Sequence, residues 1–89
     1  MKRFIICNLL LVICHLTFAQ TDFDAANAAY ADGRYEEAAA IYQSLIDEQP
    51  DATLYYNLGN ARFKQGDLAQ AILNYERALR LKPNYKDAQ

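Results

Sequence analysis

The sequence repeats itself at a spacing of 33 residues, and this periodicity limits the fold more than any other pattern in it. Each copy reads as two helical segments, because apolar residues recur every three or four positions and a glycine separates the segments. Repeats of this length are typical of proteins in which successive helical units stack. The shift superimposes Asn27 on Asn60, Ala28 on Ala61, Gly33 on Gly66, Ala38 on Ala71, Tyr42 on Tyr75 and Pro50 on Pro83.

The second copy, from Asp51 to Pro83, has the clearer helical pattern. Gly66 suits the left-handed backbone that ends a first helix, and Asp67 suits the cap of a second. We therefore expect a helical hairpin, in which the small residues Gly59 and Ala71 let the two helices lie close. The apolar positions of its second helix are Leu68, Ala71, Ile72, Tyr75, Ala78 and Leu79.

This copy resembles a tetratricopeptide repeat (TPR), a 34-residue helical hairpin with aromatic, leucine, glycine, alanine and proline residues at set positions. Arg62 departs from the pattern, since a Tyr or another bulky residue is common there. The resemblance predicts an all-α fold, an α-α superhelix or TPR-like solenoid of two hairpins plus the start of a third. The matching, repeat-packing positions are Tyr55 (where Trp is usual), Leu58, Gly59, Ala71, Tyr75, Ala78 and Pro83.

The first copy is degenerate at its start, where Asp22, Ala25 and Ala26 occupy the sites of Tyr55, Leu58 and Gly59. An alanine-rich first repeat fits the N-terminal cap of an array, because a terminal repeat has one neighbour. The packing positions retained in it are Ala38, Tyr42 and Pro50. Its first predicted helix is capped by Thr21, with Asp24 three residues on, and ends near Asp32 and Gly33. Its second predicted helix runs from about Tyr35 to Glu48 and is ended by Gln49 and Pro50.

Residues 1–19 have the pattern of a cleavable signal peptide. Lys2 and Arg3 precede an apolar run, and Ala19 is a small residue suited to cleavage before Gln20. We therefore expect export, to the periplasm or the cell envelope. Two alternatives stay open, an uncleaved membrane anchor and, less favoured, a lipoprotein site at Cys14. The predicted organisation is a signal peptide at 1–19, a degenerate repeat at 20–50, a repeat at 51–84 and the start of a further repeat helix at 85–89.

Cleavage removes Cys7, Cys14 and His15, so the mature chain has no thiol and no imidazole. Disulfides, the common nucleophile–base pairs and zinc sites of the Cys/His kind are thereby excluded. The three glycines form no phosphate-binding loop, and no pair of carboxylates is placed to face across a cleft. The sequence predicts no catalytic residues, no metal, no cofactor and no enzymatic activity.

Charge is divided unevenly along the predicted mature chain. Residues 20–51 hold eight acidic residues and one basic residue, a net charge of −7, whereas residues 52–89 hold six basic and three acidic residues, a net charge of +3. Solvated helix faces are the simplest interpretation. Attraction between the acidic and basic ends, or steering of a charged partner, is the alternative. An acidic exported chain is not expected to bind nucleic acid.

In repeat proteins, the apolar face on the second helix of a repeat is covered by the next repeat or by a polar capping helix. The sequence after Pro83 shows no polar cap, so the helix from Leu68 to Leu81 is expected to have an uncovered face. We interpret this chain as an N-terminal portion of a longer array. Self-association through that uncovered helix is a further expectation.

The TPR resemblance also implies a concave groove lined by the first helices, which binds an extended peptide or a partner helix. Packing against the neighbouring repeat is the alternative for Tyr56 and Phe63, and a hydrogen bond within the repeat is the alternative for Asn60. The matching groove positions are Phe23, Asn27, Tyr30 and Ala31 in the first copy and Thr53, Tyr56, Asn60, Phe63 and Lys64 in the second.

Two functions follow. The first is an exported TPR scaffold that mediates protein–protein interaction through this groove. Its partner is an unidentified protein or peptide, and a membrane-associated complex stays open as an alternative. The second is a structural, self-stacking array without a specific ligand, tethered to the membrane if the N-terminal segment is uncleaved. A narrower resemblance, carried by residues 54–61 and 71–79, is to BatE-type Bacteroides aerotolerance (Bat) proteins, which implies an envelope assembly linked to stress tolerance.

Overall fold

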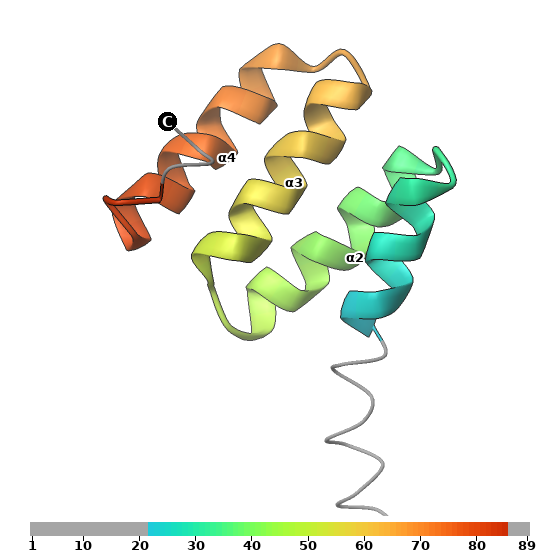
Figure 1. The fold of residues 1–89 in the computed structure, drawn as a ribbon, viewed down its shortest axis with the longest axis horizontal. Helices are drawn as coiled ribbons and strands as arrows, with labels where there is room; N and C mark the ends of the chain where they lie inside the picture. Colours follow the sequence, from blue (N-terminus) through green and yellow to red (C-terminus); the bar gives the residue numbers. More distant parts are fainter. Residues whose placement is uncertain (1–21, 86–89) are drawn as a thin grey trace, which may run out of the picture.

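The computed structural model describes residues 22–85, which form four helices and no strand. A helix at 22–31 is followed by α2 (Tyr35–Glu48), α3 (Ala52–Lys64) and α4 (Leu68–Leu81). The first two helices pair into one hairpin and α3 and α4 into a second, with α3 lying beside α2 (Figure 1). The predicted all-α solenoid is confirmed. The predicted signal peptide, the Thr21 cap and residues 86–89 lie outside the described residues.

Both hairpins turn on a glycine with left-handed backbone, which the sequence predicted for Gly66. Gly33 has φ +81° and Gly66 has φ +83°, a region that side chains of L-residues rarely adopt. The amide that follows each glycine donates back into the preceding helix, from Arg34 to the Ala29 carbonyl at 2.8 Å and from Asp67 to the Arg62 carbonyl at 2.9 Å. The two turns therefore have the same backbone conformation and the same hydrogen bond, 33 residues apart.

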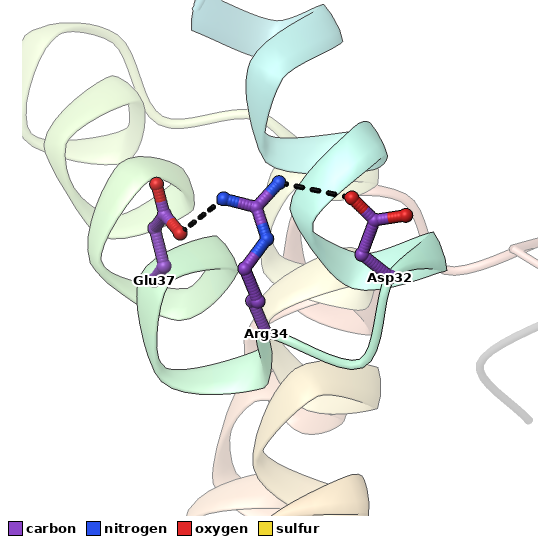
Figure 2. Close-up of polar contacts among 3 residues, drawn as sticks. All are labelled: Asp32, Arg34 and Glu37. Atoms are coloured by element: carbon purple, nitrogen blue, oxygen red, sulfur yellow. Dashed lines mark hydrogen bonds and ion pairs between the residues drawn. The ribbon is translucent and has the colours of Figure 1, made fainter.

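The helix starts differ between the two hairpins. The Asp67 carboxylate accepts from the Gln70 amide at 3.2 Å, which confirms the predicted cap of α4. Helix α2 has no side-chain cap, and Arg34 before it instead bridges Asp32 at 3.1 Å and Glu37 at 2.6 Å across the turn (Figure 2). These three side chains are exposed, so the ion pairs add little stability.

Small residues bring the helices close together. A Cβ atom built on Gly59 would lie 2.6 Å from a ring carbon of Tyr75 and 3.2 Å from the Ala71 carbonyl oxygen, which confirms the expected approach of α3 to α4. Leu58 joins the second hairpin to the first, because it is 1% exposed within the core cluster. The buried apolar residues are Ala26, Ala29, Ala38, Ala39, Tyr42, Ile46, Ala52, Leu58, Ala61, Ala71 and Ala78.

The predicted repeat-packing residues differ in burial. Leu58, Gly59, Ala71, Ala78, Ala38 and Tyr42 are buried, Tyr55 and Tyr75 are half-buried, and Pro50 and Pro83 are exposed at the ends of their hairpins. The apolar pattern of α4 likewise divides into two sets. Ala71 and Ala78 face α3, whereas Leu68 and Ile72 are 57% and 58% exposed.

Asn74 is a polar residue in the core of the second hairpin. It is 1% exposed; its Nδ2 donates to the Gln70 carbonyl at 2.8 Å, and its Oδ1 has no partner among the described residues. The position equivalent to Asn74 in the first hairpin holds Ile41. A buried acceptor without a partner destabilises a protein.

We predict that Asn74→Ile raises stability by about 1 kcal/mol, because it replaces the unpaired oxygen with apolar volume that the first hairpin accommodates. Thermal unfolding followed by circular dichroism measures this effect. The reciprocal change, Ile41→Asn, is the matched control and is expected to lower the melting temperature. A less stable Asn74→Ile variant would show that Oδ1 is satisfied in solution or that the second hairpin has no room for the larger side chain.

Candidate functional site: a groove between the first helices of the two hairpins

The helix at 22–31 and α3 contribute side chains to one pocket. Phe23, Asn27 and Tyr30 follow the i, i+4, i+7 spacing of one helix face. Of the predicted groove residues, the structure brings Asn27, Tyr30 and Asn60 together around a pocket of about 140 Å³. Tyr42 and Asn57 complete its lining.

A larger hollow lies toward the start of the same two helices. Phe23 and Thr53, two further predicted groove residues, line it together with the end of α2, and its volume is about 500 Å³. Leu45 and Leu54 supply apolar surface there, and Glu48 adds a carboxylate. Both hollows are lined by residues of the helix at 22–31 and of α3, the two helices that the repeat pattern predicts to line the groove.

The two groove asparagines each accept a hydrogen bond from a tyrosine of their own hairpin. Tyr42 Oη donates to Asn27 Oδ1 at 2.5 Å, and Tyr75 Oη donates to Asn60 Oδ1 at 2.6 Å. The alternative kept for Asn60, a hydrogen bond within the repeat, is therefore confirmed. The Nδ2 groups of Asn27 and Asn60 have no acceptor within residues 22–85, which leaves them available to donate to a ligand.

The other predicted groove residues lie outside the small pocket. The ring of Tyr56 packs against Tyr75 at a centroid distance of 5.7 Å and against Tyr85 at 5.2 Å. Phe63 is 54% exposed, and Lys64 beside it is exposed as well. Neither of these two lines the hollows described above, so they flank the groove rather than form its floor.

Asn57 is a groove residue that sequence reasoning missed. It lines the small pocket beside Asn60 and has no hydrogen-bond partner in the described part of the chain. Residues three apart lie on neighbouring positions of a helix surface, so the spacing of Asn57 and Asn60 was the available signal. Tyr42, assigned to packing, also reaches the pocket through its hydroxyl.

Burial raises the pKa of Tyr42 and of Tyr75 above the usual value near 10, and neighbouring tyrosines add to both shifts. Because the folded state keeps these phenol protons at a pH where the unfolded chain releases them, their contribution to stability is present below pH 10 and is lost as pH rises through the folded pKa values.

We predict that wild-type stability falls above about pH 10 and that the double variant Tyr42→Phe/Tyr75→Phe shows a shallower fall. The variant is less stable at neutral pH, since each lost hydrogen bond costs about 1 kcal/mol. Denaturant unfolding at a series of pH values measures both effects. Tyr35→Phe is the control, because its hydroxyl has no partner in residues 22–85. Parallel pH profiles for wild type and double variant would contradict the assignment.

Within residues 22–85, no three His, Cys, Asp or Glu side chains are grouped closely enough to hold a metal ion. No helix in the same range has the length and apolar character needed to cross a membrane.

The family model described as "Tetratricopeptide repeat" matches residues 23–86. This chain belongs to the tetratricopeptide repeat family, a family of repeat scaffolds that generally mediate protein–protein interaction. Among curated proteins it is similar to tetratricopeptide repeat protein 16 of Homo sapiens, with 38% identity over 66 residues, 73% of this chain and 8% of that protein. It is also similar to the protein SGT1 homolog of Oryza sativa subsp. japonica, with 32% identity over 74 residues, 81% of this chain and 20% of that protein.

The chain therefore spans a small part of the curated relatives it matches. The family model covers both hairpins. The narrower resemblance to BatE-type proteins stays a prediction.

Proposed function

We propose that this chain is an exported scaffold that binds a protein partner in the groove between the helix at 22–31 and α3. The observation that supports this proposal most directly is the paired arrangement of Asn27 and Asn60. Each asparagine accepts a hydrogen bond from a tyrosine hydroxyl, and the asparagine NH₂ group has no acceptor in the described structure. An extended peptide offers backbone carbonyl oxygens as acceptors along its length, so two such donors support backbone recognition that does not depend on sequence.

The larger hollow supplies the apolar part of this recognition. Phe23, Leu45 and Leu54 offer surface for one apolar side chain of the partner. Glu48 and Asp51 line the same hollow, and residues 20–51 as a whole have a net charge of −7. This combination favours a partner segment that carries an apolar residue near basic ones.

Asn57→Ala tests the proposal more cleanly than Asn60→Ala. Substitution of Asn60 also removes the hydrogen bond from Tyr75, whereas Asn57 makes no hydrogen bond within residues 22–85. We expect Asn57→Ala to weaken binding of a partner segment by about tenfold, which corresponds to about 1.4 kcal/mol, with the melting temperature unchanged. Ser44→Ala on the exposed surface of α2 is the matched control and is expected to bind as wild type does.

The measurement has two steps. Partners are first captured with the full chain from envelope extracts of the source cells and identified. Their binding segments are then titrated as synthetic peptides against the wild type, Asn57→Ala and Ser44→Ala. Equal affinity of all three proteins would count against the groove. It would favour the second candidate, a structural array without a specific ligand, which the exposed Leu68 and Ile72 of α4 support.

A further inference from the structure

Helix α4 carries an apolar strip that the described chain leaves open. Leu68 and Ile72 are 57% and 58% exposed and lie four residues apart, and Leu79 continues the strip two turns further on. The equivalent positions on α2 are occupied by Tyr35, Ala39 and Ile46. The contacts of these α2 residues show which helix covers such a strip.

On α2 the equivalent strip is covered by α3. Ala39 and Ile46 are 1% and 4% exposed, and they share one core cluster with Leu58 and Ala61 of α3. Figure 1 shows α3 lying beside α2. The internal repeat thus provides a template in which a first helix packs on the second helix of the hairpin before it. The partner of α4 is expected to have the same form.

The helix at 22–31 carries the complementary face. The 33-residue shift places Ala25 and Ala28 at the positions of Leu58 and Ala61, and both alanines are exposed. Helix 22–31 packs against α2 through the buried Ala26 and Ala29, on its other side. Within residues 22–85, one end of the molecule thus presents an open second-helix strip and the other end an open first-helix face.

The charges of the two halves of the described chain are opposite, and its two end helices have the same signs: helix 22–31 holds two acidic residues and no basic one, and α4 holds two basic residues and one acidic one. Residues 22–51 hold eight acidic residues and one basic residue, a net charge of −7, and residues 52–85 hold five basic and two acidic residues, a net charge of +3. Contact between unlike ends is electrostatically attractive, whereas contact between two α4 strips would bring two basic ends together.

We propose that the occupant of the α4 strip is a second copy of this chain, stacked head to tail, with its helix 22–31 packed on α4 as α3 packs on α2. This interface joins two different surfaces, so it is heterologous and can extend beyond two copies. Because Ala25 stands where α3 has Leu58, less apolar surface is buried than at the template interface, and the association is weak and concentration-dependent. The proposal does not depend on a ligand in the groove.

Sedimentation velocity of the full chain over a range of concentrations tests this. Wild type is expected to show a sedimentation coefficient that rises with concentration, and added salt is expected to reduce the rise. Ile72→Glu on α4 and Ala28→Glu on helix 22–31 each block one of the two surfaces, and each alone is expected to stay monomeric. Gln70→Glu, which adds the same charge at another exposed position of α4, is expected to associate as wild type does.

Mixing the two blocked variants is the decisive step. Ala28→Glu retains an intact α4 strip and Ile72→Glu an intact helix 22–31, so the mixture is expected to form a dimer and nothing larger. This recovery also shows that both variants are folded. All proteins carry the same residues 1–21, so association through that segment would be common to every sample.

Three results would overturn the proposal. Wild type that stays monomeric at every concentration would mean that no second copy covers α4. Ala28→Glu that associates as wild type does would indicate a symmetric contact between two α4 strips, which salt would strengthen. A mixture of the two variants that remains monomeric would exclude the head-to-tail contact.

Discussion

Ala71→Arg is expected to unfold the second hairpin. Ala71 is 1% exposed, and its carbonyl oxygen lies 3.2 Å from the position of a Cβ on Gly59, so α3 and α4 leave no room for a longer side chain. The guanidinium would also be a buried charge without a partner. Overpacking together with an unpaired buried charge costs about 4 kcal/mol or more, a large fraction of the stability of a domain this small.

The measurement is the helical signal in circular dichroism at 25 °C, which we expect to fall as α3 and α4 lose their structure. Ala69→Arg is the matched control, because it makes the same change at an exposed position of the same helix. Its spectrum and melting temperature are expected to match those of wild type. A folded Ala71→Arg protein would show that the two helices can separate without loss of the fold.

Leu58→Ala is expected to have the second-largest effect, a loss of about 2–5 kcal/mol from the free energy of unfolding. Leu58 is 1% exposed and belongs to the cluster that joins α3 to the first hairpin. Its removal leaves a cavity at the junction of the two repeats. In a domain of this size each lost kcal/mol lowers the melting temperature by about 4–8 °C.

Denaturant titration of wild type, Leu58→Ala and Leu68→Ala measures this loss. Leu68→Ala removes the same atoms from an exposed position of α4 and is expected to change stability by less than about 0.5 kcal/mol. Equal losses in the two variants would mean that Leu68 is covered in solution as well, which is what head-to-tail stacking predicts at high protein concentration. The comparison is therefore made at low concentration.

Several of the predicted groove residues line hollows, but their arrangement was not predicted. Asn27, Tyr30 and Asn60 line one pocket as the repeat pattern implied, whereas Phe23 and Thr53 line another and Phe63 and Lys64 line neither. The helical period specifies which residues share a face of one helix. The depth of a hollow between two helices depends on how closely they pack, and this depends on side chains from other elements.

The sequence by itself determined the local structure. The limits of α2 at Tyr35 and Glu48, the left-handed turns at Gly33 and Gly66 and the cap at Asp67 all follow from residues within one turn of the place where they act. Backbone preference and helical period are local properties, and the 33-residue repeat imposes them twice.

Only the tertiary structure decided which polar and apolar groups meet. It joins Tyr75 to Asn60 across 15 residues and buries Asn74 with an unpaired oxygen. It also covers the apolar strip of α2 while leaving Leu68 and Ile72 of α4 open. The physical reason is that burial and hydrogen bonding depend on the neighbouring helix, and a pattern within one helix does not specify what that neighbour places opposite it.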